Sequence, residues 1–191
     1  VPQSGGQTSI AHSNVTYNLM KEREPECVKK IEKEGVCYTR VLPDGDDITS
    51  TVGRGWQNTY LTNDRKEAEK AATKRGTKFE WLPDGSMKTV TNRTAIQVEE
   101  RTKQKTWFNS IIGAYTTWED ARNDRKKAVT FPNGEQMPEE VMDTLERVFE
   151  EVGVNITWQH GDVMMVDNRL ALHARSPGTA PRRILAALCD E

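Results

Sequence analysis

The sequence predicts one α+β domain, mainly β with helical insertions, whose strands form a sandwich or a barrel. The C-terminal part consists of short apolar runs, at 154–159, 163–166, 170–172 and 184–188, broken by Gly, Pro and Asn. Such runs are typical of antiparallel sheets rather than of βαβ units. Apolar residues at helical spacing over 138–152 predict at least one long helix. No low-complexity linker divides the 191 residues, so one domain is expected over 1–191.

The N-terminal third predicts two helices and a strand. Residues 5–10 are expected to be a turn that opens a short extended segment. A helix follows, capped by Ser13 or Asn14 and running to about Glu24. Pro25 suits the first turn of a second helix, which Gly35 ends.

The middle of the chain predicts a strand, a polar helix and a hairpin. Residues 36–42 alternate loosely and form the strand, before a Pro-Asp-Gly turn. Asp64 and Glu67 form a capping-box-like start for a helix that ends at Gly76. Residues 78–82 and 87–91 flank a second Pro-Asp-Gly turn, which is typical of a hairpin.

Two further strands and the longest helix complete the prediction. Strands are expected at 94–99 and 106–112. Pro138 begins the helix and Gly153 ends it. Its core-facing stripe has spacings of three and four residues and consists of Val141, Leu145, Val148, Phe149 and Val152.

Composition narrows the functional class. The net charge is −2, the pI about 6.0 and the mean hydropathy −0.76, and Lys and Arg alternate with Asp and Glu. No basic stripe is present, so nucleic acid is not expected as a partner. No apolar run approaches the ~20 residues of a membrane span, so no membrane contact is expected either. The three cysteines are irregularly spaced, and no secretory signal opens the chain. An intracellular, cytoplasmic protein is therefore expected.

Of the three histidines, His173 is the candidate ligand. His12 precedes a helix and is expected to cap it or to lie on the surface, and His160 lies in a polar, solvent-facing turn. His173 follows the apolar run 170–172 and stands two residues before Arg175. A histidine in such a run is more often a packing residue than a metal ligand.

Arg183 points to a bound anion. It begins the apolar run 184–188, where a partly buried guanidinium requires an anionic partner. Residues 176–189 contain no Asp or Glu. A bound carboxylate would meet this need, and so would a distant acidic residue or solvent.

Several motifs, in order, resemble the taurine dioxygenase and clavaminate synthase-like superfamily, and most closely its plant members. They are Gly5-Gly6-Gln7-Thr8, Trp107-Phe108-Asn109, Gly161-Asp162-Val163, Asp167-Asn168-Arg169, His173 and Pro181-Arg182-Arg183. The resemblance implies a double-stranded β-helix, or jelly roll. It also implies an Fe(II)/2-oxoglutarate-dependent oxygenase that oxidises a C–H bond of a small-molecule substrate with O2, while 2-oxoglutarate is decarboxylated to succinate.

Residue roles follow from the same resemblance. His173 would be the distal ligand of an iron held by two histidines and one carboxylate. Arg183 would bind the distal carboxylate of 2-oxoglutarate, and the Thr8 hydroxyl would donate a hydrogen bond to that co-substrate. Asn109 and Tyr115 are candidate substrate-pocket residues, with ordinary packing as the alternative.

The family's other two ligands form a His-x-(Asp/Glu) motif before the Gly-Gly-x-Thr segment, and no such motif stands there in this sequence. His160-Gly161-Asp162 has the pattern at the wrong position. The chain is therefore expected to lack its N-terminal part and to be inactive alone. A non-catalytic jelly-roll scaffold and a halogenase variant of the chemistry remain alternatives. The sequence fixes neither the substrate nor the oligomeric state.

Overall fold

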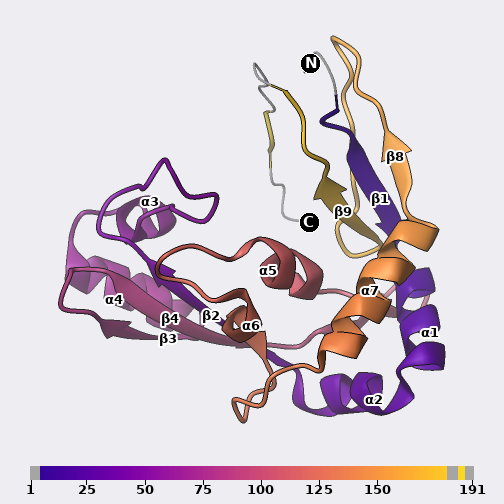
Figure 1. Cartoon of the computed structure of the whole chain (residues 1–191), viewed down its shortest axis with the longest axis horizontal. Coiled ribbons are helices and arrows are strands. Elements are labelled where there is room, and N and C mark those ends of the chain that lie inside the picture. The colour runs from indigo at the N-terminus through magenta and orange to yellow at the C-terminus, as the bar shows by residue number, and fades with distance from the viewer. Residues whose placement is uncertain (1–4, 180–184, 188–191) are drawn as a thin grey trace.

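The computed structural model describes residues 5–179 and 185–187, and it combines helices with antiparallel sheets (Figure 1). The elements along the chain are β1 (Thr8–His12), α1 (Ser13–Arg23), α2 (Pro25–Glu34), β2 (Val36–Leu42), α3 (Trp56–Tyr60), α4 (Arg65–Lys74), β3 (Thr77–Trp81), β4 (Met87–Arg93), β5 (Ile96–Val98), β6 (Lys105–Trp107), α5 (Ile111–Thr117), α6 (Arg125–Ala128), β7 (Val129–Thr130), α7 (Glu139–Val152), β8 (Val154–Ile156) and β9 (Ala171–Arg175). The α+β class is confirmed. The expectation that the chain is mainly β is wrong for the described residues, because helices hold more of them than strands do.

Among the described residues, the strands form three separate sheets. One has the order β3-β4-β2-β7, a second is the β5-β6 hairpin, and the third has the order β8-β1-β9. In the third sheet β1 lies between two strands from the C-terminal part, and both pairings are antiparallel. Figure 1 shows this sheet at the opposite end of the molecule from the β2-β3-β4 sheet, with α5 and α6 between them and α7 directly below β8.

The main core lies where α1, α2 and α7 pack together with β6 and α5. Met142, Leu145 and Val148 of α7 are at most 1% exposed and meet Met20 and Trp107. Of the predicted apolar stripe, Val141, Leu145 and Val148 are confirmed as core residues, whereas Phe149 and Val152 are only partly buried. A smaller core between α3, α4 and the β2-β3-β4 sheet includes Trp56 and Met87.

Most helix ends lie close to where capping residues and glycines in the sequence predicted them. The prediction that Ser13 or Asn14 caps α1 is wrong, because both lie inside the helix. The His12 Nδ1 accepts a hydrogen bond of 3.2 Å from the Asn14 backbone N–H, so His12 is the cap, one of the two roles expected for it. Gly35 follows α2 with a φ of 75°, a conformation that favours glycine. The Asp64 carboxylate accepts from two backbone N–H groups at the start of α4.

Two strand predictions are wrong. Residues 106–112 continue β6 only to Trp107, because the Asn109 side chain accepts a hydrogen bond from the Ile111 N–H and the chain enters α5. Residues 163–166 form no strand, and Val163 and Met165 are more than nine-tenths exposed. The predicted run at 154–159 is paired only over β8, and the run at 184–188 lies mostly outside the described residues.

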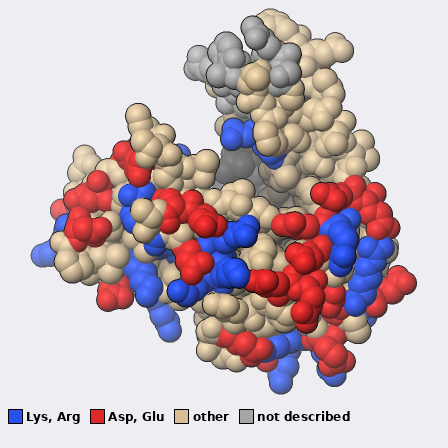
Figure 2. Space-filling view, in the orientation of Figure 1, with Lys and Arg blue, Asp and Glu red and all other residues tan. Residues whose placement is uncertain are grey.

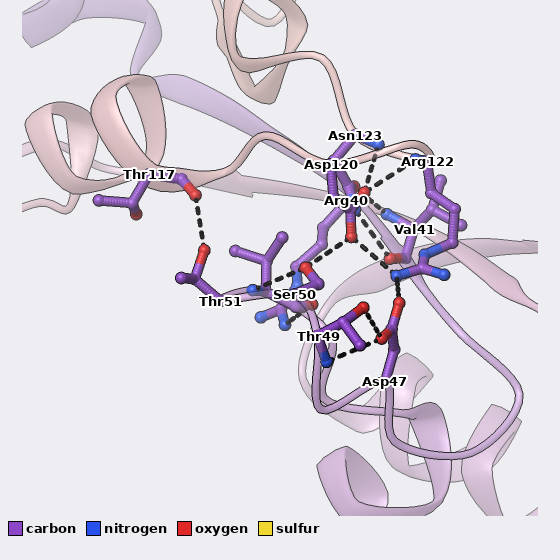
Figure 3. A network of polar contacts seen from close by, with 11 residues as sticks. Arg40, Val41, Asp47, Thr49, Ser50, Thr51, Thr117, Asp120, Arg122 and Asn123 are labelled. Carbon is purple, nitrogen blue, oxygen red and sulfur yellow. Dashed lines mark hydrogen bonds and ion pairs between the residues drawn. The ribbon is translucent and has the colours of Figure 1, made fainter. Parts of the chain in front are cut away.

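A polar network ties the 43–55 loop to the segment between α5 and α6 (Figure 3). The Arg122 guanidinium bridges Asp47 and Asp120 at 2.6 and 2.8 Å. Asp120 also accepts from the Ser50 hydroxyl at 2.8 Å. These charge-assisted contacts hold α5 against the β2 side of the molecule, and α5 directly follows one wall of the site described below.

No helix within the described ranges is both long and apolar enough to cross a membrane.

Candidate functional site: a pocket on the three-stranded sheet

The β1–β9 pairing brings Thr8 and His173 to the same face of one sheet. Ile10 lies opposite His173, and Thr8 lies opposite Arg175. Cross-strand partners share a face, as do residues two apart in a strand. Thr8, His173 and Arg175 therefore project to one side of the sheet.

Glycines let the two strands continue together beyond β1. Gly5 and Gly178 form an antiparallel bridge, and the Gly6 N–H donates to the Pro177 carbonyl at 2.7 Å. A Cβ on Gly178 would lie 2.7 Å from the Gly6 nitrogen, closer than real side chains come. A Cβ on Gly5 would likewise lie 2.5 Å from the Pro177 carbonyl oxygen, so glycine at 5 and at 178 allows this close backbone approach beside Thr8.

Thr8 is buried, and a tryptophan holds its hydroxyl. The Trp158 indole N–H donates to the Thr8 Oγ1 at 2.8 Å, and Thr8 is 6% exposed. Because the oxygen accepts from the indole, the hydroxyl hydrogen is directed elsewhere and can be donated to a ligand. No local pattern indicates this pairing, since 150 residues separate the two positions.

These side chains line one pocket of about 400 Å³. Its polar part includes Thr8, Trp158, His173 and Arg175, and its apolar part includes Met164 and Val166, as well as residues 185–187. A volume of this order suits a small molecule. The pocket offers a hydroxyl, an imidazole and a guanidinium to whatever it binds.

Arg175 is a site residue that sequence reasoning passed over. Within residues 5–179 and 185–187 its side chain makes no ion pair, and it borders the pocket next to Thr8. A guanidinium in this position can bind a carboxylate. The signal was available, because a residue two positions after His173 in a strand shares its face.

A second pocket, of about 260 Å³, lies on another side of His173. Its lining is Phe108, Asn109, Ser110, Asn168, Leu172 and His173. The Asn109 amide donates to the Ala95 carbonyl and accepts from the Ile111 N–H, both at 3.0 Å. Asn109 thus lines a pocket next to His173 while both ends of its amide bind backbone.

Other predicted residues lie elsewhere. Tyr115 borders neither pocket; it packs against the main core with Arg125 over its ring. His160 is exposed in a turn, as expected, and Asp162 accepts a hydrogen bond from the Gln159 N–H there. Arg183, the predicted carboxylate-binding residue, lies outside the described residues.

Tyr38 supports the wall of the second pocket from β2. Its phenol oxygen accepts a hydrogen bond of 3.0 Å from the Ser110 N–H. Burial raises the pKa of Tyr38 to about 12. The phenol therefore stays neutral at every physiological pH.

The described residues alone do not fit a complete iron site. In the described ranges, no three His, Cys, Asp or Glu side chains gather into a group that could hold a metal ion. His173 is one exposed imidazole, whereas a site with two histidines and one carboxylate needs two further ligands.

Charged side chains are unevenly distributed around this region. On the face drawn in Figure 2, acidic and basic residues are intermixed over the helices, whereas the surface over β1, β8 and β9 is largely uncharged.

Comparison with known proteins defines the class. The model of the taurine catabolism dioxygenase TauD, TfdA family matches residues 1–189. The chain belongs to this family.

Two curated relatives are similar over nearly the whole chain. The clavaminate synthase-like protein At3g21360 of Arabidopsis thaliana is 47% identical over 189 residues, which cover 98% of this chain and 57% of the relative. The dapdiamide synthesis protein DdaC of Enterobacter agglomerans is 26% identical over 197 residues, covering 97% and 57%. The chain thus spans less than two thirds of the length of either relative.

Proposed function

We propose that this chain is the co-substrate-binding portion of an Fe(II)/2-oxoglutarate-dependent oxygenase with a jelly-roll fold. The observation that carries the proposal is the shared pocket of Thr8, His173 and Arg175 on the β1–β9 face. Family membership supports the reaction class, in which a small-molecule substrate is oxidised by O2 while 2-oxoglutarate is converted to succinate.

Each residue has a distinct role in this proposal. Thr8, oriented by Trp158, donates its hydroxyl hydrogen to a co-substrate carboxylate. Arg183 supplies the main charge for that carboxylate, and Arg175, opposite Thr8 on β9, adds a second cation at the same pocket. His173 is one iron ligand. The proposal requires the other two ligands to come from polypeptide outside the described residues.

The test is an anaerobic titration of the longest polypeptide that the gene encodes with Fe(II) and 2-oxoglutarate. The expected result is a visible charge-transfer band that needs both components. His173→Ala should abolish the band and turnover, whereas His160→Ala, a matched histidine in an exposed turn, should leave both unchanged. Arg183→Ala should raise the 2-oxoglutarate requirement by orders of magnitude, since it removes a charge-assisted bidentate contact.

A non-catalytic scaffold is the second candidate, favoured by the absence of a ligand cluster among the described residues. A folded, full-length protein that never shows the band would support the scaffold and refute the oxygenase. An unchanged 2-oxoglutarate requirement in Arg183→Ala would assign that residue to structure alone.

A further inference from the structure

The second pocket has two walls that come from distant parts of the chain. One wall is the segment 108–110, which directly follows β6. The other is formed by Asn168, Leu172 and His173, from the turn before β9 and from β9 itself. The width of the pocket therefore depends on how the β5–β6 hairpin is held against the turn before β9.

The tip of that hairpin contains a buried carboxylate. The Glu99 side chain is 3% exposed. One of its oxygens accepts from the Arg101 Nε at 2.8 Å and from the Arg101 backbone N–H at 3.2 Å. The other accepts from the Thr102 N–H at 2.7 Å. The hydrogen bond from Arg101 is the main cause that lowers the pKa of Glu99 to about 2, so this carboxylate is a fixed anion at neutral pH.

Arg101 spans from this anion to the second wall. Its Nε binds Glu99, and its Nη2 binds the Asp167 Oδ2. The other oxygen of Asp167 accepts from the Arg169 N–H at 3.0 Å, and the Asp167 carbonyl accepts from the Leu170 and Ala171 N–H groups at 3.1 and 2.9 Å. Asp167 is thus the residue around which the chain turns into β9.

We propose that Arg101 is a positioning residue for His173. By bridging Glu99 and Asp167, it fixes the turn at 167–170 relative to the β5–β6 hairpin, and so sets where His173 stands across from the 108–110 wall. Only the use of His173 as an iron ligand rests on the proposed function; the positioning itself does not.

The geometry separates this contact from an ordinary surface ion pair. An ion pair between two exposed, flexible side chains contributes little to stability, and the Arg101 side chain is 63% exposed. One end of the bridge, however, is a buried carboxylate that also accepts hydrogen bonds from the backbone N–H groups of Arg101 and Thr102, which hold it in place without the guanidinium. A planar guanidinium that binds through two different nitrogens transmits that fixed orientation to Asp167. A lysine has a single ammonium nitrogen, so it cannot bind Glu99 and Asp167 through two different nitrogens.

Arg101→Lys is the first test, because it keeps the positive charge and removes the contact through two nitrogens. Asp167→Asn removes the anion at the far end and serves as the second variant in case the first does not fold. Lys103→Gln is the matched control, since it removes an exposed charge from the same hairpin tip.

The readout is the nitrogen and carbon chemical shifts of histidine rings in the chain labelled at histidine, without metal or co-substrate. Only three histidines are present, so each signal can be assigned. Arg101→Lys and Asp167→Asn should shift or broaden the His173 signals and leave those of His160, which lies in an exposed turn, unchanged. His12 lies opposite Ala171 in the β1–β9 pairing, so its signals do not serve as a control. The amide protons of Leu170 and Ala171, which donate to Asp167, should exchange roughly tenfold faster, as expected when a local opening becomes easier. Lys103→Gln should alter none of these.

A purely structural role would lower the unfolding midpoint while the His173 signals stayed in place, and that result would overturn the proposal. Because no metal or co-substrate is used, this outcome is independent of whether the charge-transfer band forms. If the charge-transfer band forms and Arg101→Lys has no effect on the His173 signals, the oxygenase proposal stands and the positioning role is refuted. His173 shifts in a protein that never forms the band would support the positioning role alone.

Discussion

Gly178→Ala is the sharpest test of the strand pairing that creates the pocket. An added Cβ would lie 2.7 Å from the Gly6 nitrogen and 2.8 Å from its Cα. Both neighbours are backbone atoms, which cannot rotate away. The φ of Gly178 is not positive, so the substitution introduces crowding without a conformational penalty of its own.

The expected cost can be worked from these contacts. Ordinary van der Waals contact begins at 3.4 Å, so the strands must separate by several tenths of an ångström. Overpacking of this kind costs about 1–3 kcal/mol. Stretching the 2.7 Å hydrogen bond between Gly6 and Pro177 adds up to about 1 kcal/mol. We expect a loss of about 2–3 kcal/mol in the free energy of unfolding.

Urea denaturation followed by tryptophan fluorescence measures this loss. Gly113→Ala is the control, because nothing lies within 4 Å of its added Cβ and it stands inside α5. There alanine should stabilise by about 0.5–1 kcal/mol through helix propensity. If Gly178→Ala unfolds within 0.5 kcal/mol of the parent, roughly the scatter of neutral surface changes, the close approach of the two strands is refuted.

Three further predictions follow from other contacts. Tyr38→Phe should lower stability by about 1 kcal/mol, since the Ser110 N–H loses its acceptor; equal urea midpoints for the two proteins would contradict this. Burial raises the pKa of Cys27 to about 11, so at pH 8 its alkylation by iodoacetamide should be roughly a hundredfold slower than that of a free thiol, and rapid labelling would count against its burial. Hydrogen bonds from Thr49 and then Arg122 lower the pKa of Asp47 to about 2. Its stabilising contribution is therefore present above pH 4 and lost as the pH falls towards 2; hydrogen exchange in the 43–55 loop should quicken over that range and not near neutrality.

Helix ends were predictable because their signals are local. Asp64 accepts backbone hydrogen bonds at the start of α4, and Gly35 takes the positive φ that ends α2. Such caps depend on residues within one turn of the helix. The sequence around each position was therefore sufficient.

The two wrong strand predictions failed for different reasons. The paired isoleucines at 111 and 112 favour a strand by composition, yet Asn109 binds backbone on both sides and turns the chain into α5. The apolar run at 163–166 finds no strand partner among the described residues, and hydrophobicity without pairing does not make a strand.

In the candidate site, too, positions set by a local pattern could be predicted, whereas contacts between distant strands could not. The approach of Thr8 to His173 was expected only through the family resemblance, because no local pattern specifies which strands pair. Trp158 was missed for the same reason. Arg175 could have been found, since alternation along β9 alone places it beside His173.

The central position of β1 in its sheet has a consequence for how the protein folds. Thr8 meets its indole partner across 150 residues of sequence, so the loop closed by this sheet is among the longest available to the chain. Long-range pairings of this kind form slowly, after helices and hairpins whose contacts are local. During synthesis the β1 strand must wait until β8 and β9 have emerged before either neighbour exists. The pocket should therefore be the last part of the molecule to assemble.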